Sequence, residues 1–123
     1  NATLEVDLIG QACSESIGHK QFSGTGGQLD FVRGAALSKG GKSFLSTYST
    51  TKNDTISKIK PMLTEGAHVT CTKNDIDYAV TEYGVAKLKG KTASQRAKEL
   101  INIAHPKFRE ELTLEAKKMY LII

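Results

Sequence analysis

The stretch TASQRAKELINIAHPKF, from Thr92 to Phe108, decides the fold of the C-terminal third of the chain. Thr92 is followed three residues later by Gln95, a spacing typical of a capping box at the start of a helix. Apolar residues then recur at helical spacing, at Ala97, Leu100, Ile101 and Ala104. The pattern predicts a helix that runs to about Ala104.

His105 and Pro106 predict the end of this helix and the start of another. Proline is tolerated at the first position of a helix because an N–H group there would have no partner within the helix. After Pro106, an apolar stripe at helical spacing predicts a final helix, with Phe108, Leu112, Ala116 and Met119. We expect His105 to cap or pack at this junction rather than to act as a general base.

The residues ahead of Thr92 predict mostly short strands. In TLEVDLIG, residues 3–10, apolar and acidic residues alternate as in a half-buried strand. The segment QLDFVRGAALS, residues 28–38, suits a helix. Further strands are expected in QACSESIG (11–18), SFLSTY (43–48), AHVTCT (67–72) and DYAVT (77–81), with a broken edge strand in KIKPML (58–63) and a polar loop in STTKNDTIS (49–57). The order of elements predicts one α/β unit over residues 1–123.

The composition excludes several classes of protein. The 123 residues fit one domain with a core, and no segment approaches the roughly 20 apolar residues that cross a bilayer. The N-terminus lacks the features of a signal peptide, so we expect a soluble, cytoplasmic protein with no membrane partner. The 17 Lys and Arg residues are dispersed among 13 acidic ones and do not interleave with aromatic residues, which argues against a nucleic-acid partner.

The cysteines and histidines show no pattern of a metal or redox site. Cys13 and Cys71 lack CxxC spacing, and the three histidines lack the spacing of metal ligands. We expect two reduced thiols and no bound metal. His19 and His68 have no neighbouring serine or cysteine arrangement that they could activate as a nucleophile.

Two sets of basic residues each leave two interpretations open. Lys87, Lys89 and Lys91 form either a solvated loop, which is favoured, or a contact to an anionic group such as a phosphate. Arg33 either binds a phosphate or, slightly favoured, pairs with Asp30 within one helix.

The loop GTGGQ, Gly24 to Gln28, places three glycines directly ahead of the expected helix over residues 28–38. Residues without a Cβ let backbone N–H groups approach a ligand closely, and the start of a helix carries partial positive charge. The residues alone leave two interpretations equally open: an anion-stabilising loop, or a glycine turn that binds nothing.

Four blocks of sequence together resemble the C-terminal domain of the acetyl-CoA hydrolase/transferase family, and in particular CoA-transferases of the 4-hydroxybutyrate and butyrate:acetate type. They are EVDLIGQ, QFSGTGGQLDF, VTEYG and INIAHPKFREEL, and the resemblance runs from about residue 4 to residue 112. It implies the CoA-transferase (NagB/RpiA-like) fold, an open mixed, mostly parallel sheet with flanking helices, of which this chain is the C-terminal half.

The resemblance also implies an activity. Members of the family move CoA between an acyl-CoA and a short-chain carboxylate, such as acetate, butyrate or 4-hydroxybutyrate, through a glutamyl-CoA thioester, which is covalent nucleophilic catalysis. Coenzyme A is then a substrate, and no cofactor is bound permanently. The nucleophilic glutamate of the family lies upstream of this domain, so we assign that role to neither Glu5 nor Glu15. We expect the chain to be a fragment that is inactive alone, with the N-terminal half and further copies of the enzyme as partners.

The site residues implied by the resemblance fall into two groups. Supporting catalytic roles, including stabilisation of an oxyanion, fall to Gly26, Gly27, Gln28 and Glu82. Substrate binding falls to Gly24, Thr25, Cys13 and Ser14. Cys13 departs from the family, because some relatives carry asparagine at its position. Glu82 follows a strand in VTEYG, where a loop-bracing role is equally open.

Two other functions remain open at the level of sequence. An acyl-CoA hydrolase differs only in letting water resolve the acyl-enzyme intermediate. A non-catalytic CoA-binding or interaction module would keep the fold without the chemistry.

Overall fold

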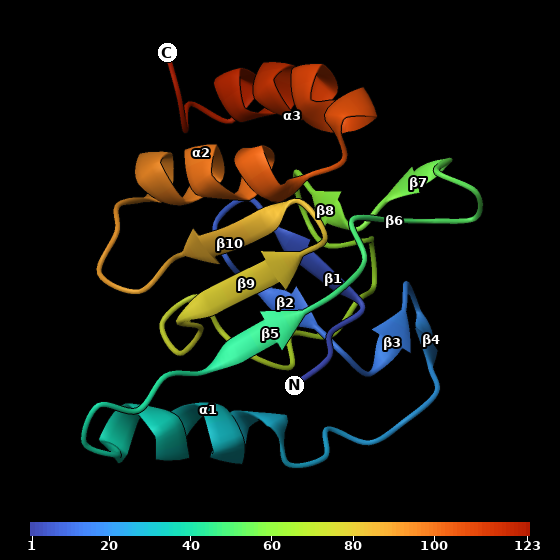
Figure 1. Ribbon diagram of the computed structural model, residues 1–123. Helices are drawn as coiled ribbons and strands as arrows, with labels where there is room; N and C mark the ends of the chain where they lie inside the picture. The colour runs from blue at the N-terminus through green and yellow to red at the C-terminus, as the bar shows by residue number, and fades with distance from the viewer.

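The structure, a computed structural model, describes residues 1–123 and arranges its helices and strands in layers (Figure 1). Helix α2 (Ala93–Ile103) covers one side of the strands, and α3 (Pro106–Lys118) packs on α2 as an outer layer. Helix α1 (Gln28–Leu37) lies on the opposite side (Figure 1). None of the three helices is long and apolar enough to cross a membrane.

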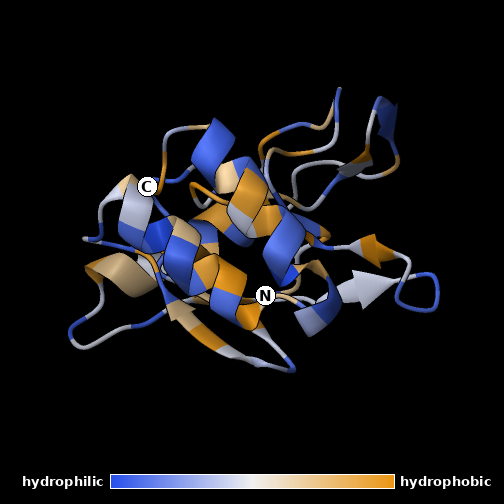
Figure 2. Cartoon of the chain, turned by 90° about the horizontal axis from the view of Figure 1, so that it is seen from above, coloured by the Kyte–Doolittle hydropathy of each residue, from blue (hydrophilic) through white to orange (hydrophobic).

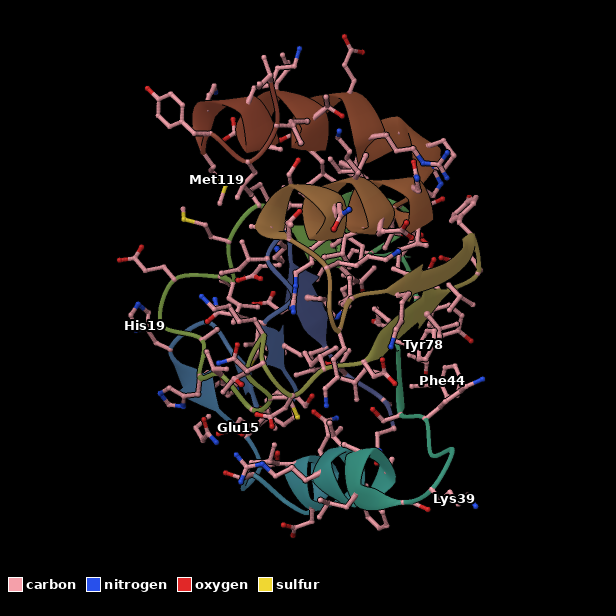
Figure 3. The ribbon with its side chains drawn as sticks, turned by 90° about the vertical axis from the view of Figure 1, so that its left-hand side faces the viewer. Glu15, His19, Lys39, Phe44, Tyr78 and Met119 are labelled. Carbon is pink, nitrogen blue, oxygen red and sulfur yellow. The ribbon has the colours of Figure 1, made fainter.

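The strands form two three-stranded sheets, each with a central strand that has one antiparallel and one parallel neighbour. The first sheet has the order β2 (Ala12–Cys13), β1 (Glu5–Asp7), β8 (Ile59–Lys60). The second has the order β10 (Gly84–Lys87), β9 (Tyr78–Thr81), β5 (Phe44–Ser46). Its register places Phe44 opposite Tyr78, and their two rings are stacked with centroids 4.9 Å apart (Figure 3).

Two antiparallel hairpins complete the fold. They are β3 (Ser16–Ile17) with β4 (Lys20–Gln21), and β6 (Thr50–Thr51) with β7 (Ile56–Ser57). Only β1–β8 and β5–β9 pair in parallel, so the expected mostly parallel sheet is wrong, although the mixed α/β class is confirmed. The reason is connection length, because strands joined by short turns can pair only antiparallel.

The helix predictions are confirmed at their ends. The Thr92 hydroxyl accepts from the backbone N of Gln95 at 3.2 Å, and the Gln95 side chain accepts from the backbone N of Thr92 at 2.9 Å, which completes the capping box. His105 caps α3, since its Nδ1 accepts from the backbone N of Lys107 at 3.1 Å, and Pro106 is the first helical residue.

The strand predictions are confirmed in part. Strands β1, β5, β8 and β9 lie where the sequence predicts them. The strand expected over residues 11–18 is broken into β2 and β3, because the backbone N of Ser14 bonds to the Thr70 hydroxyl instead of a ladder. The strand expected over residues 67–72 is absent, since this segment makes only one isolated bridge, from Cys71 to Ala12. The loop predicted over residues 49–57 contains the β6–β7 hairpin, and strand β10 was not predicted.

One core joins all the layers. It is a cluster of 18 buried residues that draws on both three-stranded sheets and on all three helices. Seen from above, hydrophilic and hydrophobic residues alternate along the C-terminal helices, as expected for helices with one buried face (Figure 2).

Buried Glu15 fixes the stem of the glycine loop (Figure 3). One carboxylate oxygen accepts from the Thr70 hydroxyl at 2.8 Å, and the other accepts from the Gln21 side-chain amide at 3.2 Å. The same amide donates to the carbonyl of Ser23 at 2.6 Å, and the Glu15 carbonyl accepts from the backbone N of Ser23 at 3.3 Å. Because Ser23 immediately precedes Gly24, these bonds hold the base of the loop.

We predict that Glu15→Ala lowers the free energy of unfolding by about 1–3 kcal/mol, because it leaves the buried Thr70 hydroxyl without its acceptor and removes one of the two acceptors of the Gln21 amide. Chemical denaturation measures the change. Glu65→Ala is the matched control, since Glu65 is exposed and its side chain makes no hydrogen bond, so its effect should stay within about 0.5 kcal/mol. Equal effects of the two substitutions would contradict a role for Glu15 in holding the loop.

Candidate functional site

The glycine loop ends in an uncapped helix start. Residues 24–27 are exposed, and Gly27 is the N-cap of α1 without any side-chain hydrogen bond to the helix. None of the backbone N–H groups from Gly24 to Asp30 donates a hydrogen bond within the chain. The loop therefore presents free donors at the positive end of a helix dipole.

The three glycines of the loop are not equivalent. Gly26 has a φ of +63°, a conformation that other residues adopt only with strain, so the turn itself requires glycine at this position. Gly27 has a φ of −101°, which any residue can adopt. Gly24 has no atom within 4 Å of the position of a Cβ. At Gly24 and Gly27 the backbone conformation gives no reason for glycine.

Gln28 is buried and joins α1 to the N-terminal segment. Its side-chain nitrogen donates to the carbonyl of Ala2 at 2.7 Å, and its side-chain oxygen accepts from the Ser14 hydroxyl at 2.8 Å. The structure thus brings together two predicted site residues, Ser14 and Gln28. Both ends of the amide are already bonded within the chain, so its contact to a substrate stays a prediction.

Cys13 lies beside Ser14 but is fully buried. Its sulfur is 3.4 Å from the carbonyl of Ser16 and 3.3 Å from the Ser16 hydroxyl. The second cysteine, Cys71, is also a buried free thiol, and burial raises its pKa above the ordinary value. Neither thiol is placed as an exposed nucleophile, and substrate binding by Cys13 stays a prediction.

Glu82 lies at the rim of a pocket of about 600 Å³. It occupies the two-residue turn between β9 and β10, and its Oε1 accepts from the backbone N of Ser49 at 2.7 Å. The pocket is bounded by residues 2–4, by residues 46–48, 50 and 51, by residues 80–82 and by Lys58. Its wall includes Ala2, the residue that Gln28 binds, so the start of α1 and the pocket share one side of the molecule (Figure 1).

Sequence reasoning missed one residue of this pocket, Lys58. It stands in a segment predicted only as an edge strand, with a second lysine two residues later. The structure places it in the pocket lining, to which an exposed tyrosine, Tyr48, also belongs. Burial lowers the pKa of Lys58, while the negative charge of Glu5 partly opposes this shift.

The other basic candidates find partners within the chain. Arg33 pairs with Asp75 at 3.2 Å, so the expected pairing with Asp30 is wrong. The Thr72 hydroxyl, and then Arg33, hold the pKa of Asp75 below its usual value. Asp75 offers Arg33 an acceptor that is already oriented and half-buried, which an exposed residue on the same helix does not.

Two of the three lysines at positions 87–91, and Glu5, also have partners within the chain. Lys87 pairs with Asp77 and Lys91 pairs with Glu99, while Lys89 is exposed. Buried Glu5 accepts from the backbone N and the hydroxyl of Thr64, at 2.8 and 2.9 Å. Its carboxylate, like that of Glu15, is engaged on both oxygens.

Known proteins place these features in one family. Residues 1–116 match the acetyl-CoA hydrolase/transferase C-terminal domain. The chain is 68% identical to a succinyl-CoA:cyclohexane-1-carboxylate CoA transferase of Geobacter metallireducens, over 97% of this chain and 27% of that protein. It is 60% identical to a 4-hydroxybutyrate coenzyme A transferase of Clostridium kluyveri, over 98% of this chain and 28% of that protein.

A solved structure agrees with these sequence matches. The crystal structure of RipA from Yersinia pestis superposes with a TM-score of 0.92 at 50% identity, covering 99% of this chain and 27% of that one. The chain thus spans little more than a quarter of the length of these relatives. It belongs to the acetyl-CoA hydrolase/transferase family and corresponds to the C-terminal domain of that family.

Proposed function

We propose that this chain is part of an enzyme that transfers CoA between an acyl-CoA and a carboxylic acid, and that it supplies the donors that stabilise the reacting thioester oxygen. The observation that carries the proposal is the row of free backbone N–H groups from Gly24 to Asp30 at an uncapped helix start. Similarity to CoA-transferases over nearly the whole chain supports it. The NagB/RpiA-like fold of the complete enzyme is part of the same proposal.

The chemistry follows from the charge that each step creates. A glutamate carboxylate from outside this chain attacks the thioester carbonyl, whose oxygen becomes an oxyanion, and the CoA thiolate leaves to give an acyl-glutamyl anhydride. The thiolate then attacks the glutamyl carbonyl, releases the acyl carboxylate and forms a glutamyl-CoA thioester. The acceptor carboxylate reverses these steps. Donors of the loop, near Gly26 and Gly27, face the oxyanion, and Glu82 orients the reacting carboxylates.

We predict that the 123-residue chain alone shows no CoA transfer between butyryl-CoA and acetate, whereas the complete enzyme does. The reason is that neither Glu5 nor Glu15 has a free carboxylate oxygen to act as nucleophile. The rate of acetyl-CoA formation, monitored by chromatography, measures the activity of the chain and of the complete enzyme. Turnover by the purified chain would place the nucleophile within it, and hydrolysis without transfer in the complete enzyme would favour an acyl-CoA hydrolase.

We predict that Glu82→Gln and Glu82→Ala lower kcat of the complete enzyme by about one to three powers of ten, as expected for loss of one oriented charge at the reacting groups. Gln keeps an acceptor for the backbone N of Ser49, so this variant should fold normally. Glu110→Gln, on the exposed surface of α3, is the control. A lowered melting temperature with normal kcat would make Glu82 a brace of the turn instead.

We predict that Gly27→Val costs on the order of 3 kcal/mol in transition-state stabilisation, about the effect of losing one oxyanion donor. The backbone N–H group remains, but the valine side chain would crowd the site that the thioester oxygen must reach. A Cβ at Gly27 would meet the Phe31 ring at 3.5 Å, an ordinary contact, so the variant should keep its fold. Gly34→Val, on the same helix with open space around it, is the control. Measurement of kcat per folded active site decides, and full activity of Gly27→Val would mean that the loop binds no oxyanion.

A further inference from the structure

Lys58 differs from every other half-buried lysine of the chain. Four lysine side chains are half-buried: Lys58, Lys60, Lys87 and Lys91. The other three each have a carboxylate within 4.0 Å, from Glu5, Asp77 and Glu99 respectively. Lys58 makes no ion pair, and no side-chain hydrogen bond of Lys58 exists within the chain. Partial burial of a cation without a partner costs free energy, which an anion beside it would offset.

The lining of the pocket around Lys58 suits a small organic acid as its ligand. Besides Lys58, only Glu82 carries charge among the lining residues. The apolar part of the wall comes from Ala2, Leu4 and Val80, and hydroxyl groups such as that of Thr47 supply the polar part. A pocket of about 600 Å³ lined by hydroxyl-bearing and apolar side chains is of the size that holds small ligands.

The two charged groups of the pocket are positioned differently. Glu82 is exposed at the rim and is held by the backbone N of Ser49 at 2.7 Å. Lys58 is fixed through its backbone, which donates to the carbonyl of Ser49 at 2.8 Å and accepts from the backbone N of Val6 at 3.0 Å. Ser49 therefore binds both the carboxylate of Glu82 and the backbone of Lys58. With one lysine and one glutamate in its lining, the pocket carries no excess positive charge, which favours a single carboxylate over a phosphate with up to two negative charges.

We propose that Lys58 binds the carboxylate of the acid that accepts CoA, so that this pocket is the acceptor subsite for a monocarboxylate with an apolar chain. The inference rests on the proposed CoA transfer and adds to it the residue that recognises the acceptor. The ammonium group would donate charge-assisted hydrogen bonds to the carboxylate, while the apolar wall contacts its hydrocarbon part. Lys58 then contributes chiefly to acceptor affinity rather than to binding of the CoA thioester.

The test uses the complete enzyme with butyryl-CoA as donor and acetate as acceptor. Lys58→Met keeps the length of the side chain and removes its charge, and it should raise KM for acetate roughly 10- to 100-fold, the effect of losing one hydrogen bond to a charged group. KM for butyryl-CoA should stay within about twofold, and Lys58→Arg should restore most of the acetate affinity. Lys60→Met is the matched control, because Lys60 pairs with Glu5 and lies outside the pocket lining.

Each result supports or overturns the assignment. An unchanged KM for acetate in folded Lys58→Met, or an equal rise in Lys60→Met, overturns it. Should Lys58→Met fail to fold, Lys58→Gln replaces it, and an unchanged KM for acetate in folded Lys58→Gln overturns the assignment. A wild-type enzyme without any CoA transfer would contradict the proposed function alone. Propionate binding to wild type and Lys58→Arg, but not to Lys58→Gln, by ligand-observed NMR would then still support the carboxylate site, and equal binding to all three would overturn it.

Discussion

The buried amide of Gln28 is the contact on which the arrangement of this site depends. Gln28 is the first residue of α1. Its side-chain nitrogen donates to the carbonyl of Ala2, and its side-chain oxygen accepts from the hydroxyl of Ser14. A buried amide without partners costs free energy, so these bonds fix where the helix starts relative to the N-terminal segment. Since Ala2 also lines the pocket, the side chain of Gln28 connects the start of α1 to the pocket that Glu82 lines.

The two sides of this arrangement are built in different ways. The loop side is held from below by Glu15, whose carboxylate binds Thr70 and Gln21, while its tip stays free. The pocket side is held by backbone bonds around Ser49 and by the tight turn that carries Glu82. An exposed loop that is positioned by a rigid scaffold is typical of a binding site.

Local signals in the sequence predicted the helices and the family, but not the contacts that join distant segments. The capping box needs only Thr92 and Gln95, three residues apart, and it was predicted at the correct position. The sequence slightly favours Asp30, on the same helix, over a phosphate as the partner of Arg33, whereas its partner Asp75 lies 42 residues away in a loop that only the folded chain brings near. Lys58 gave no signal, because its distinguishing property is the absence of a partner in space. The difference between Gly26 and Gly27 is likewise a matter of φ, which composition does not reveal.

The exposure of the loop donors has a consequence for the strength of the field that they can exert. At 4 Å, two unit charges interact by about 1 kcal/mol in water but by about 4 kcal/mol at an effective dielectric constant of 20. In this chain the N–H groups of residues 24–27 face solvent, where water competes for any anion placed near them. The interaction of the same N–H groups with an anion becomes several times stronger once another surface covers them and lowers the local dielectric constant. Covering the loop would therefore strengthen its attraction for an anion without any movement of the loop itself.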